Sequence, residues 1–298
     1  MDGILCLDKE EELTSFLCCS LVRRLLKVKK AGHAGTLDPM ATGVLPILVG
    51  RATRALDWLP VHDKRYTAEV QLGLVSDSLD IWGSCRETGA AFPSPAAVEA
   101  ALSTFRGDIL QIPPMLSALK KDGVRLYEMA RQGVEVERTP RPVTIYALEM
   151  LEYDQASGRL RLDCLCSKGT YIRTLCDDLG RALGCGAVMA GLRRTMAAGY
   201  TLDQCVTLEE ARALADAGGL EDRLLPIESA FTVYPALTVT DAQATRFCNG
   251  GALALERLRE PVHDTVRVKA PDGRFLGLGR PEADSLQVGY LALTAEQT

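Results

Sequence analysis

The chain has 298 residues, of which 47% are hydrophobic and 24% charged, with a formal net charge of −5. These values are typical of one large globular domain, or of a large and a small one. The net negative charge excludes a protein that coats nucleic acid without specificity. No apolar run approaches the roughly 20 residues that cross a bilayer, and the N-terminus is acidic where a secretory signal is basic. We therefore expect a cytoplasmic protein with no membrane partner.

The ten cysteines and three histidines are poorly spaced for metal binding. No C-x-x-C pair occurs, so we expect reduced cysteines that pack in the core and no metal site. The glycine-rich signatures of nucleotide triphosphate and dinucleotide sites are also missing, which predicts no cofactor of those classes.

The first predicted helix covers residues 15–28. Its expected apolar stripe is formed by Leu17, Leu21, Leu25 and Val28, whereas most of its basic residues face away. No acidic residue lies between Leu13 and Leu37. The pattern fits either a solvated helix face or a local site for a polyanion. In the second case, phosphates would contact Arg23, Arg24, Lys27 and the basic side chains of residues 120–141.

An isolated carboxylate follows this basic helix. Asp38 precedes Pro39, which disfavours helix at Asp38 and holds it extended, and Gly32, Gly35 and Gly43 allow the backbone to bend around it. Taken alone, Asp-Pro is more typical of a turn than of a catalytic site.

The middle of the chain alternates strands and helices without regular βαβ order. Residues 66–74 alternate as a half-buried strand, and Ser94-Pro95 caps a helix that stops before Gly107. Residues 111–142 are rich in glycine and proline around a short helical piece near 127–132. We interpret them as a long excursion from the core.

The next part of the chain predicts a strand at 159–166 and a helix at 171–183, so that SKGTYIRT at 167–174 is a strand-to-helix junction. Thr207 and Glu210 form a capping box for a further helix. From about residue 231 the chain becomes β-rich, with glycine turns, which predicts domains at 1–230 and 231–298.

Three residues have side chains suited to chemistry on a nucleobase. An ionised carboxylate such as Asp38 can act as a nucleophile if a cation supports it, and Arg173 lies off its helix's apolar stripe, where it could pair with Asp38. Tyr66 could present a ring to a base. Ser117 and Lys120 also match the S-x-x-K pattern of serine acyl enzymes, without the companion motifs.

The segment GHAGTLDPMATGVLP, residues 32–46, resembles the catalytic motif of the TruB family of pseudouridine synthases. Further motifs of that family follow the same order along residues 3–230, and the tail more loosely resembles its small PUA-like RNA-binding domain. The matching segments are 7–9, 64–66, 77–83, 105–108, 111–115, 117–120, 167–174 and 192–194.

This resemblance implies an α+β fold: a central mixed, largely antiparallel sheet with flanking helices, then a β-rich PUA-like domain. It implies isomerisation of uridine 55 to pseudouridine in the tRNA T loop by a monomer, with no cofactor and no protein partner. The motif positions imply Asp38, Tyr66 and Arg173 as catalytic residues. The implied substrate-binding residues are Lys9, His33, Lys64, Asp80, Lys120, Tyr171 and Leu192.

Three positions depart from the usual family pattern, and none of them is a catalytic residue. Glu10 replaces a common proline, Ala34 a frequent threonine, and Trp82 a common acidic residue. The resemblance also leaves open whether Asp38 attacks the ribose or the base, or only assists proton transfer. A tRNA-binding folding factor with secondary catalysis is the alternative function, and a Ser-Lys hydrolase a third.

Overall fold

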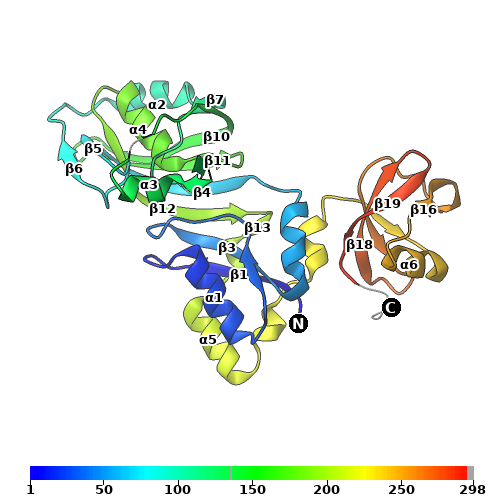
Figure 1. The fold of residues 1–298 in the computed structure, drawn as a ribbon. Helices are drawn as coiled ribbons and strands as arrows, with labels where there is room; N and C mark the ends of the chain where they lie inside the picture. Colours follow the sequence, from blue (N-terminus) through cyan, green and yellow to red (C-terminus); the bar gives the residue numbers. More distant parts are fainter. Residues whose placement is uncertain (118, 122, 135, 294–298) are drawn as a thin grey trace.

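The computed structural model describes residues 1–117, 119–121, 123–134 and 136–293. Figure 1 shows a large N-terminal part built on one sheet and a smaller C-terminal part with its own sheet. The described strands of the large sheet run in the order β14-β1-β3-β12-β4-β11-β10-β7, with β2 beside β3 and β13 beside β12. Their bounds are β1 Gly3–Lys9, β2 Ala31–His33, β3 Thr42–Val49, β4 Lys64–Leu72, β7 Gly107–Gln111, β10 Arg141–Asp154, β11 Arg159–Cys166, β12 Ala187–Ala197, β13 Tyr200–Thr201 and β14 Val206–Thr207.

The large sheet is mixed but mainly antiparallel, as predicted. Only the β1–β14 and β3–β12 pairings are parallel among its described strands. The β3–β12 pairing sets Thr42 beside Arg193 and Gly43 beside Arg194. It therefore brings the chain that follows Asp38 against β12 in the middle of the sheet.

The predicted strand at residues 66–74 is present as β4, Lys64–Leu72, while Leu74 belongs to the separate strand β5. Tyr66, Ala68, Val70 and Leu72 are buried on one side, and the alternate residues are more exposed. This alternation is what a strand with one face on the core requires. It points Tyr66 toward the same face as the core and the cleft described below.

Helices cover the edges and one face of the large sheet (Figure 1). The N-cap hydroxyls of Ser94 and Thr207 accept hydrogen bonds from the backbones of Ala97 and Glu210, as their sequence positions predict. The left-handed Gly218 ends the last of these helices. The helices are α1 Ser15–Leu25, α2 Pro95–Ser103, α3 Leu126–Arg131, α4 Ile172–Ala182 and α5 Leu208–Ala217.

Helix α1 differs from its prediction in length and in its buried face. It ends at Leu25, and its buried residues are Ser15, Cys18, Cys19 and Val22. The predicted stripe residue Leu17 is instead 41% exposed. Two cysteines form part of the buried face because their small side chains allow the helix to pack closely on the sheet.

The excursion at residues 111–142 contains short elements rather than a layer of the fold. They are β8 Lys120–Lys121, β9 Val124–Arg125 and helix α3, while the short strands β5 Leu74–Ser76 and β6 Cys85–Glu87 form a separate hairpin. Leu126 is buried, which ties the start of α3 to the protein.

The C-terminal sheet has the described order β15-β17-β18-β19-β16 and packs against helix α6, Asp241–Cys248. Its bounds are β15 Ala236–Thr238, β16 Leu253–Ala254, β17 Val266–Lys269, β18 Phe275–Glu282 and β19 Ser285–Leu291. The β-rich character of the tail is thus confirmed, while the exact boundary near residue 231 stays a prediction.

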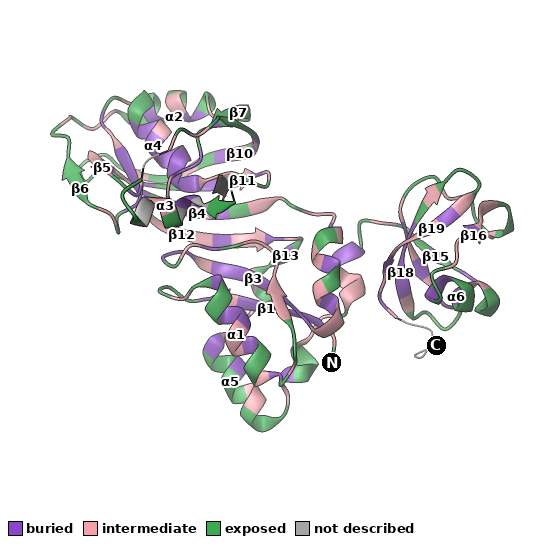
Figure 2. Cartoon of the chain, in the orientation of Figure 1, coloured by how far each residue is buried: buried purple, intermediate pink, exposed green. Residues whose placement is uncertain are grey.

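The two parts share an apolar cluster. Phe231 is fully buried between them, and its ring centroid lies 5.9 Å from that of Phe275 and 5.8 Å from that of Tyr290. The same cluster contains Ile4 and Leu48 of the large sheet. Figure 2 shows buried residues continuing along the strands of both sheets, with exposed residues on the outer faces of α1, α5 and α6.

All ten cysteines are free thiols, and no described helix is long and apolar enough to cross a membrane. Within the described ranges, no three His, Cys, Asp or Glu side chains come together as a group that could hold a metal ion.

Candidate active site

A cleft of about 1640 Å³ opens at the start of α1, beside β4 and the N-terminus of α4. It brings together most of the side chains predicted for the site, from segments more than 100 residues apart in sequence. Those that line it are His33, Asp38, Lys64, Tyr66, Asp80, Tyr171, Arg173 and Leu192.

Asp38 lies in a tightly fixed loop, residues 35–41, which we call the Asp38 loop. The Ser15 hydroxyl at the start of α1 accepts a hydrogen bond from the Leu37 backbone N–H (2.9 Å) and donates one to the Leu37 carbonyl (3.1 Å). The carbonyl of Asp38 accepts from the Ala41 N–H at 3.0 Å, which closes a turn. The turn expected from Asp-Pro is therefore present, and it holds the carboxylate at the cleft surface.

Lys9 supports this loop from inside the protein. Its side chain is fully buried, and its ammonium donates to the carbonyls of Glu10 (2.9 Å), Leu13 (2.7 Å) and Pro39 (3.1 Å). Burial lowers the pKa of Lys9 below that of a free lysine. In this structure the buried ammonium of Lys9 supports the residue after Asp38, and its substrate contact stays a prediction.

Arg194 supports the other end of the loop, and the sequence patterns gave it no role. Its fully buried guanidinium donates to the carbonyls of Gly35 (3.0 Å), Thr36 (3.1 Å) and Val44 (2.8 Å). Gly43 has φ +103°, and a Cβ there would collide with the Arg194 carbonyl oxygen, so this close approach requires glycine.

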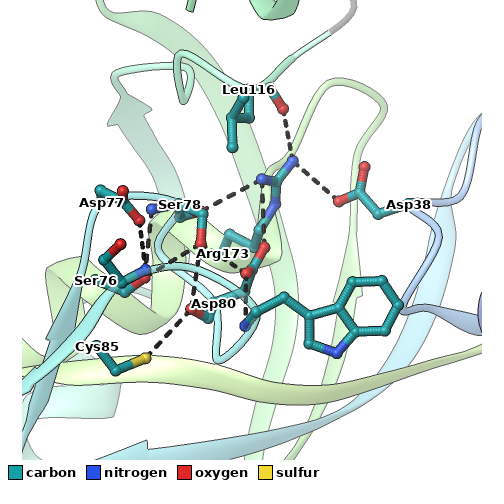
Figure 3. Close-up of polar contacts among 10 residues, drawn as sticks. Asp38, Ser76, Asp77, Ser78, Asp80, Cys85, Leu116 and Arg173 are labelled. Carbon is teal, nitrogen blue, oxygen red and sulfur yellow. Dashed lines mark hydrogen bonds and ion pairs between the residues drawn. The ribbon is translucent and has the colours of Figure 1, made fainter. Parts of the chain in front are cut away.

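Arg173 pairs with Asp38, as the sequence suggested it could. Its Nη2 atom lies 3.0 Å from Asp38 Oδ2, and the same nitrogen donates to the Leu116 carbonyl at 2.8 Å (Figure 3). The guanidinium is 6% exposed, whereas the Asp38 side chain is 39% exposed. The cation is therefore fixed by the protein, and the carboxylate remains open to a ligand.

Asp80 lies on the opposite side of Arg173, in residues 77–84, which we call the Asp80 loop. Its Oδ2 is 3.5 Å from Arg173 Nη1, and its Oδ1 accepts from the Ser78 hydroxyl (2.7 Å) and the Trp82 N–H (3.1 Å). The side chain is 10% exposed. Both carboxylate oxygens of Asp80 thus have protein partners (Figure 3), while Asp80 also lines the cleft, and its contact with flipped-out nucleotides stays a prediction.

Tyr66 is buried beneath the cleft, and burial raises its pKa to about 12 despite the neighbouring Arg194 guanidinium. Its phenol is therefore protonated near neutral pH. Burial also lowers the pKa of His33 and of Lys64, in both cases with help from the charge of Arg194. His33 keeps its Nδ1 buried without a hydrogen-bond partner among the described residues.

Tyr171 and Leu192 line the cleft, and a residue absent from the predictions positions the first of them. Gln111 is 1% exposed, and its amide both donates to the Tyr171 carbonyl (3.2 Å) and accepts from the Tyr171 N–H (2.9 Å). It thereby fixes the residue before α4. Ser117 is buried and lines the cleft, whereas the side chain of Lys120 lies outside the described residues, so the Ser-Lys pair stays a prediction.

The basic residues predicted to meet phosphates are on the surface of α1. Arg23, Arg24 and Lys27 are all exposed, at or just beyond the C-terminal end of this helix. Their position leaves both alternatives open, a solvated helix face and a phosphate-binding face.

Chemically, the cleft brings the accessible carboxylate of Asp38 together with the fixed Arg173 cation and the neutral Tyr66 phenol. Such a set can provide a nucleophile or base for an uncharged ring, and it needs no bound metal for either role.

The sequence matches three family models in succession. Residues 23–172 match the TruB family pseudouridylate synthase N-terminal domain, residues 173–232 the tRNA pseudouridylate synthase B C-terminal domain, and residues 235–288 the domain described as pseudouridine synthase II TruB, C-terminal. The matches leave few residues of the chain uncovered.

Curated relatives agree with these models. The chain is 46% identical over 287 residues to tRNA pseudouridine synthase B of Pseudomonas fluorescens (strain Pf0-1), covering 95% of this chain and 93% of the relative. It is 41% identical over 286 residues to tRNA pseudouridine synthase B of Dehalococcoides mccartyi (strain CBDB1), covering 95% and 94%.

Solved structures with the same fold include a chain of a Cbf5-Nop10-Gar1 complex, with a TM-score of 0.75 and 24% identity. A chain of an H/ACA ribonucleoprotein bound to a substrate RNA containing 2′-deoxyuridine gives a TM-score of 0.75 and 22% identity. Each match covers 99% of this chain and 86% of the other. The three family matches and the curated relatives show that this chain belongs to the TruB family of pseudouridine synthases, and the solved structures share its fold.

Proposed function

We propose that this protein converts uridine to pseudouridine in tRNA, at position 55 of the T loop, with Asp38 as the catalytic carboxylate. The observation that carries the proposal is the ion pair between Asp38 and Arg173 at the wall of a cleft large enough for a nucleotide. The names of the relatives support tRNA as the substrate. The T loop and position 55 are expectations from the family resemblance.

The reaction rearranges one nucleoside. The bond between C1′ and N1 breaks, a bond between C1′ and C5 forms, the C5 proton leaves to solvent, and N1 gains a proton. Electrons balance within the substrate. The arrangement suits Asp38 to the nucleophile or base role, because Arg173 Nη2 holds one carboxylate oxygen at 3.0 Å and the side chain, 39% exposed, stays open to the substrate.

The target uridine must leave its stack to reach Asp38. Extrusion costs roughly a few kcal/mol, which contacts elsewhere in the complex must offset. Tyr66 and Leu192 offer the base an apolar pocket beside the carboxylate. The neutral Tyr66 phenol adds no charge that would repel Asp38.

The test is tritium release from C5-labelled uridine in a T-arm stem-loop. Wild-type protein should release tritium when the label is at position 55 and not when it is at position 54. Asp38→Asn should lower the rate by at least about 10³-fold, because it removes the reacting group, with binding and folding nearly unchanged.

Ser117→Ala is the control for the hydrolase alternative, and should retain activity. Binding of the stem-loop without tritium release by wild type would favour the folding-factor alternative. Full activity of Asp38→Asn would contradict the role of Asp38.

A further inference from the structure

Trp82 exposes a large aromatic ring inside the cleft. The residue is 53% exposed and lines the same cavity as Asp38 and Tyr66. Proteins usually cover an indole, since its large apolar faces gain from leaving water. An uncovered indole in a ligand cleft suggests that a flat, apolar group covers it when the ligand is bound.

The backbone beneath this ring is held firmly. Asp80 Oδ1 accepts from the Trp82 N–H at 3.1 Å, and the next residue, Gly83, has no room for a side chain because its Cβ would collide with Ser78 Oγ. The Ile81 N–H bonds to the Met189 carbonyl on β12 at 2.9 Å. Trp82 thus projects from a fixed support, which lowers the entropy cost of stacking on it.

The nature of the covering group follows from the reaction in the same cleft. When one base leaves its stack, a face of each neighbouring base loses its partner, and aromatic side chains replace such partners without regard to base identity. The reacting uridine is taken to lie beside Asp38, Tyr66 and Leu192, so the exposed Trp82 ring, on another loop of the same cleft, is available to a neighbouring base.

We propose that Trp82 stacks on a nucleobase adjacent to the target uridine and so holds the RNA strand open during the reaction. The inference rests on the proposed function, because it takes the ligand to be the RNA loop. It gives Trp82 a substrate-binding role, expressed in affinity and KM more than in the rate of the bound complex.

Ile81 offers a matched control from the same loop. It is 43% exposed and lines a separate cavity of about 490 Å³ on the other side of the loop. A change at Ile81 disturbs the same segment without touching the catalytic cleft.

The first experiment measures binding of the stem-loop to full-length protein by fluorescence anisotropy of a labelled RNA. Trp82→Leu should weaken binding about tenfold, Trp82→Phe much less, and Ile81→Ala not at all. Two further stem-loops carry an abasic site, one 5′ and one 3′ of the target. One of these abasic loops should bind wild type about tenfold more weakly than the intact loop does. Trp82→Leu should not change its affinity further, because the base that stacks on Trp82 is already missing.

The stacking inference is overturned if Trp82→Leu binds the intact loop with the affinity of wild type. It is also overturned if the substitution weakens binding of both abasic loops by the same factor as binding of the intact loop. Wild type that neither binds the stem-loop nor releases tritium would overturn the proposed function itself. Release of tritium by wild type together with a null effect of Trp82→Leu overturns only the inference.

A second experiment observes the ring directly. The chain has only two tryptophans, so Trp58→Phe leaves Trp82 as the single indole fluorophore. In a Trp58→Phe, Asp38→Asn protein, binding of the intact stem-loop should quench the emission strongly, and the abasic loop identified above should quench it weakly. Unchanged emission at saturating RNA would show that no base covers Trp82.

Discussion

The two loops that face each other across the cleft are held by charges of opposite sign. The Asp38 loop turns its carbonyls inward, where the buried cations Lys9 and Arg194 donate to them. In the Asp80 loop, N–H groups bond instead to the loop's own carboxylates: that of Ser84 to Asp77 at 2.9 Å, on the surface, and that of Trp82 to Asp80. Across the described part of the chain, Arg173 is the one side chain that pairs with a carboxylate in each loop.

This difference shows how a reactive acid can be isolated. Buried carbonyls need hydrogen-bond donors, and buried N–H groups need acceptors. Which backbone groups a loop turns inward therefore decides whether cations or carboxylates can support it. The cations Lys9 and Arg194 hold the loop of Asp38 without bonding to its carboxylate, whereas acidic supports there would repel that carboxylate. The Asp80 loop can use acids because Arg173 lies between Asp80 and Asp38.

Removing Arg173, the cation that pairs with both loops, should have the largest effect on stability and rate. Arg173→Leu leaves the buried Asp80 unpaired, which should cost about 3–5 kcal/mol of unfolding free energy, and should lower kcat by about 10²–10³-fold. The pair with Asp38 adds little to stability because that carboxylate is well exposed. Denaturant melts and single-turnover tritium release measure the two effects.

Arg161→Leu is the control at the surface. Arg161 lies 3.6 Å from Glu152, and both side chains are well exposed, at 50% and 69%, so its loss should change the unfolding free energy by under about 0.5 kcal/mol. Equal losses in the two variants would show that burial of the Arg173 network is irrelevant.

Breaking the cationic support alone should have a smaller effect. Lys9→Met keeps the apolar stem and removes the donors to three carbonyls, one of which, that of Pro39, retains the Glu12 N–H. We expect a loss of about 1–3 kcal/mol in unfolding free energy and a fall in kcat, with KM nearly constant.

The exposed Lys29 provides the comparison, since Lys29→Met should leave stability unchanged. A raised KM with normal kcat in Lys9→Met would instead favour the predicted substrate contact of Lys9.

Changing only the charge of the acidic support should have a still smaller effect. Asn at position 80 can still accept from Ser78 and Trp82 but cannot pair ionically with Arg173. Asp80→Asn should therefore lower kcat by about tenfold through a less well-fixed Arg173, with RNA affinity close to wild type.

Asp77→Asn keeps the acceptor for Ser84 and involves no described ion pair, so it should act nearly as wild type. If Asp80→Asn reduced affinity and spared kcat, the direct nucleotide contact expected from the sequence would be favoured.

The smallest expected effect is a pH dependence at His33. Burial, then the Arg194 charge, lowers the pKa of His33 in the folded state. As the pH falls below the ordinary histidine value of about 6.5, the unfolded chain binds a proton first, so stability is lost relative to higher pH. Wild type should lose unfolding free energy between pH 7 and pH 5 relative to His33→Gln, and identical pH profiles would contradict the shift.

The sequence predicts local elements well because their signals are local. The alternation around Tyr66 and the capping box at Thr207 each depend on a few adjacent residues, and both are present. The pairing of Asp38 with Arg173 follows from their chemistry and motifs as an expectation, whereas their 3.0 Å separation depends on the β3–β12 pairing, which no local pattern encodes.

The supporting residues could not be predicted for the same reason. Lys9 and Arg194 look like surface cations in sequence, and only the fold reveals that each meets three inward carbonyls. Likewise Gln111 lies 60 residues from Tyr171, and nothing near either residue indicates their contact. The predicted stripe of α1 is confirmed in part, since Leu21, Leu25 and Val28 pack against the core. Leu17 is exposed instead, and the pattern missed the buried cysteines because it weights leucine above cysteine.

The shared aromatic cluster around Phe231 affects how the whole chain unfolds. Phe231 contacts both Phe275 and Tyr290, within a cluster that also contains Ile4 and Leu48. Melting either part alone would leave apolar surface of the other part in water, which couples their melting. The small C-terminal sheet therefore does not act as an independent appendage, and the protein should denature in one cooperative transition.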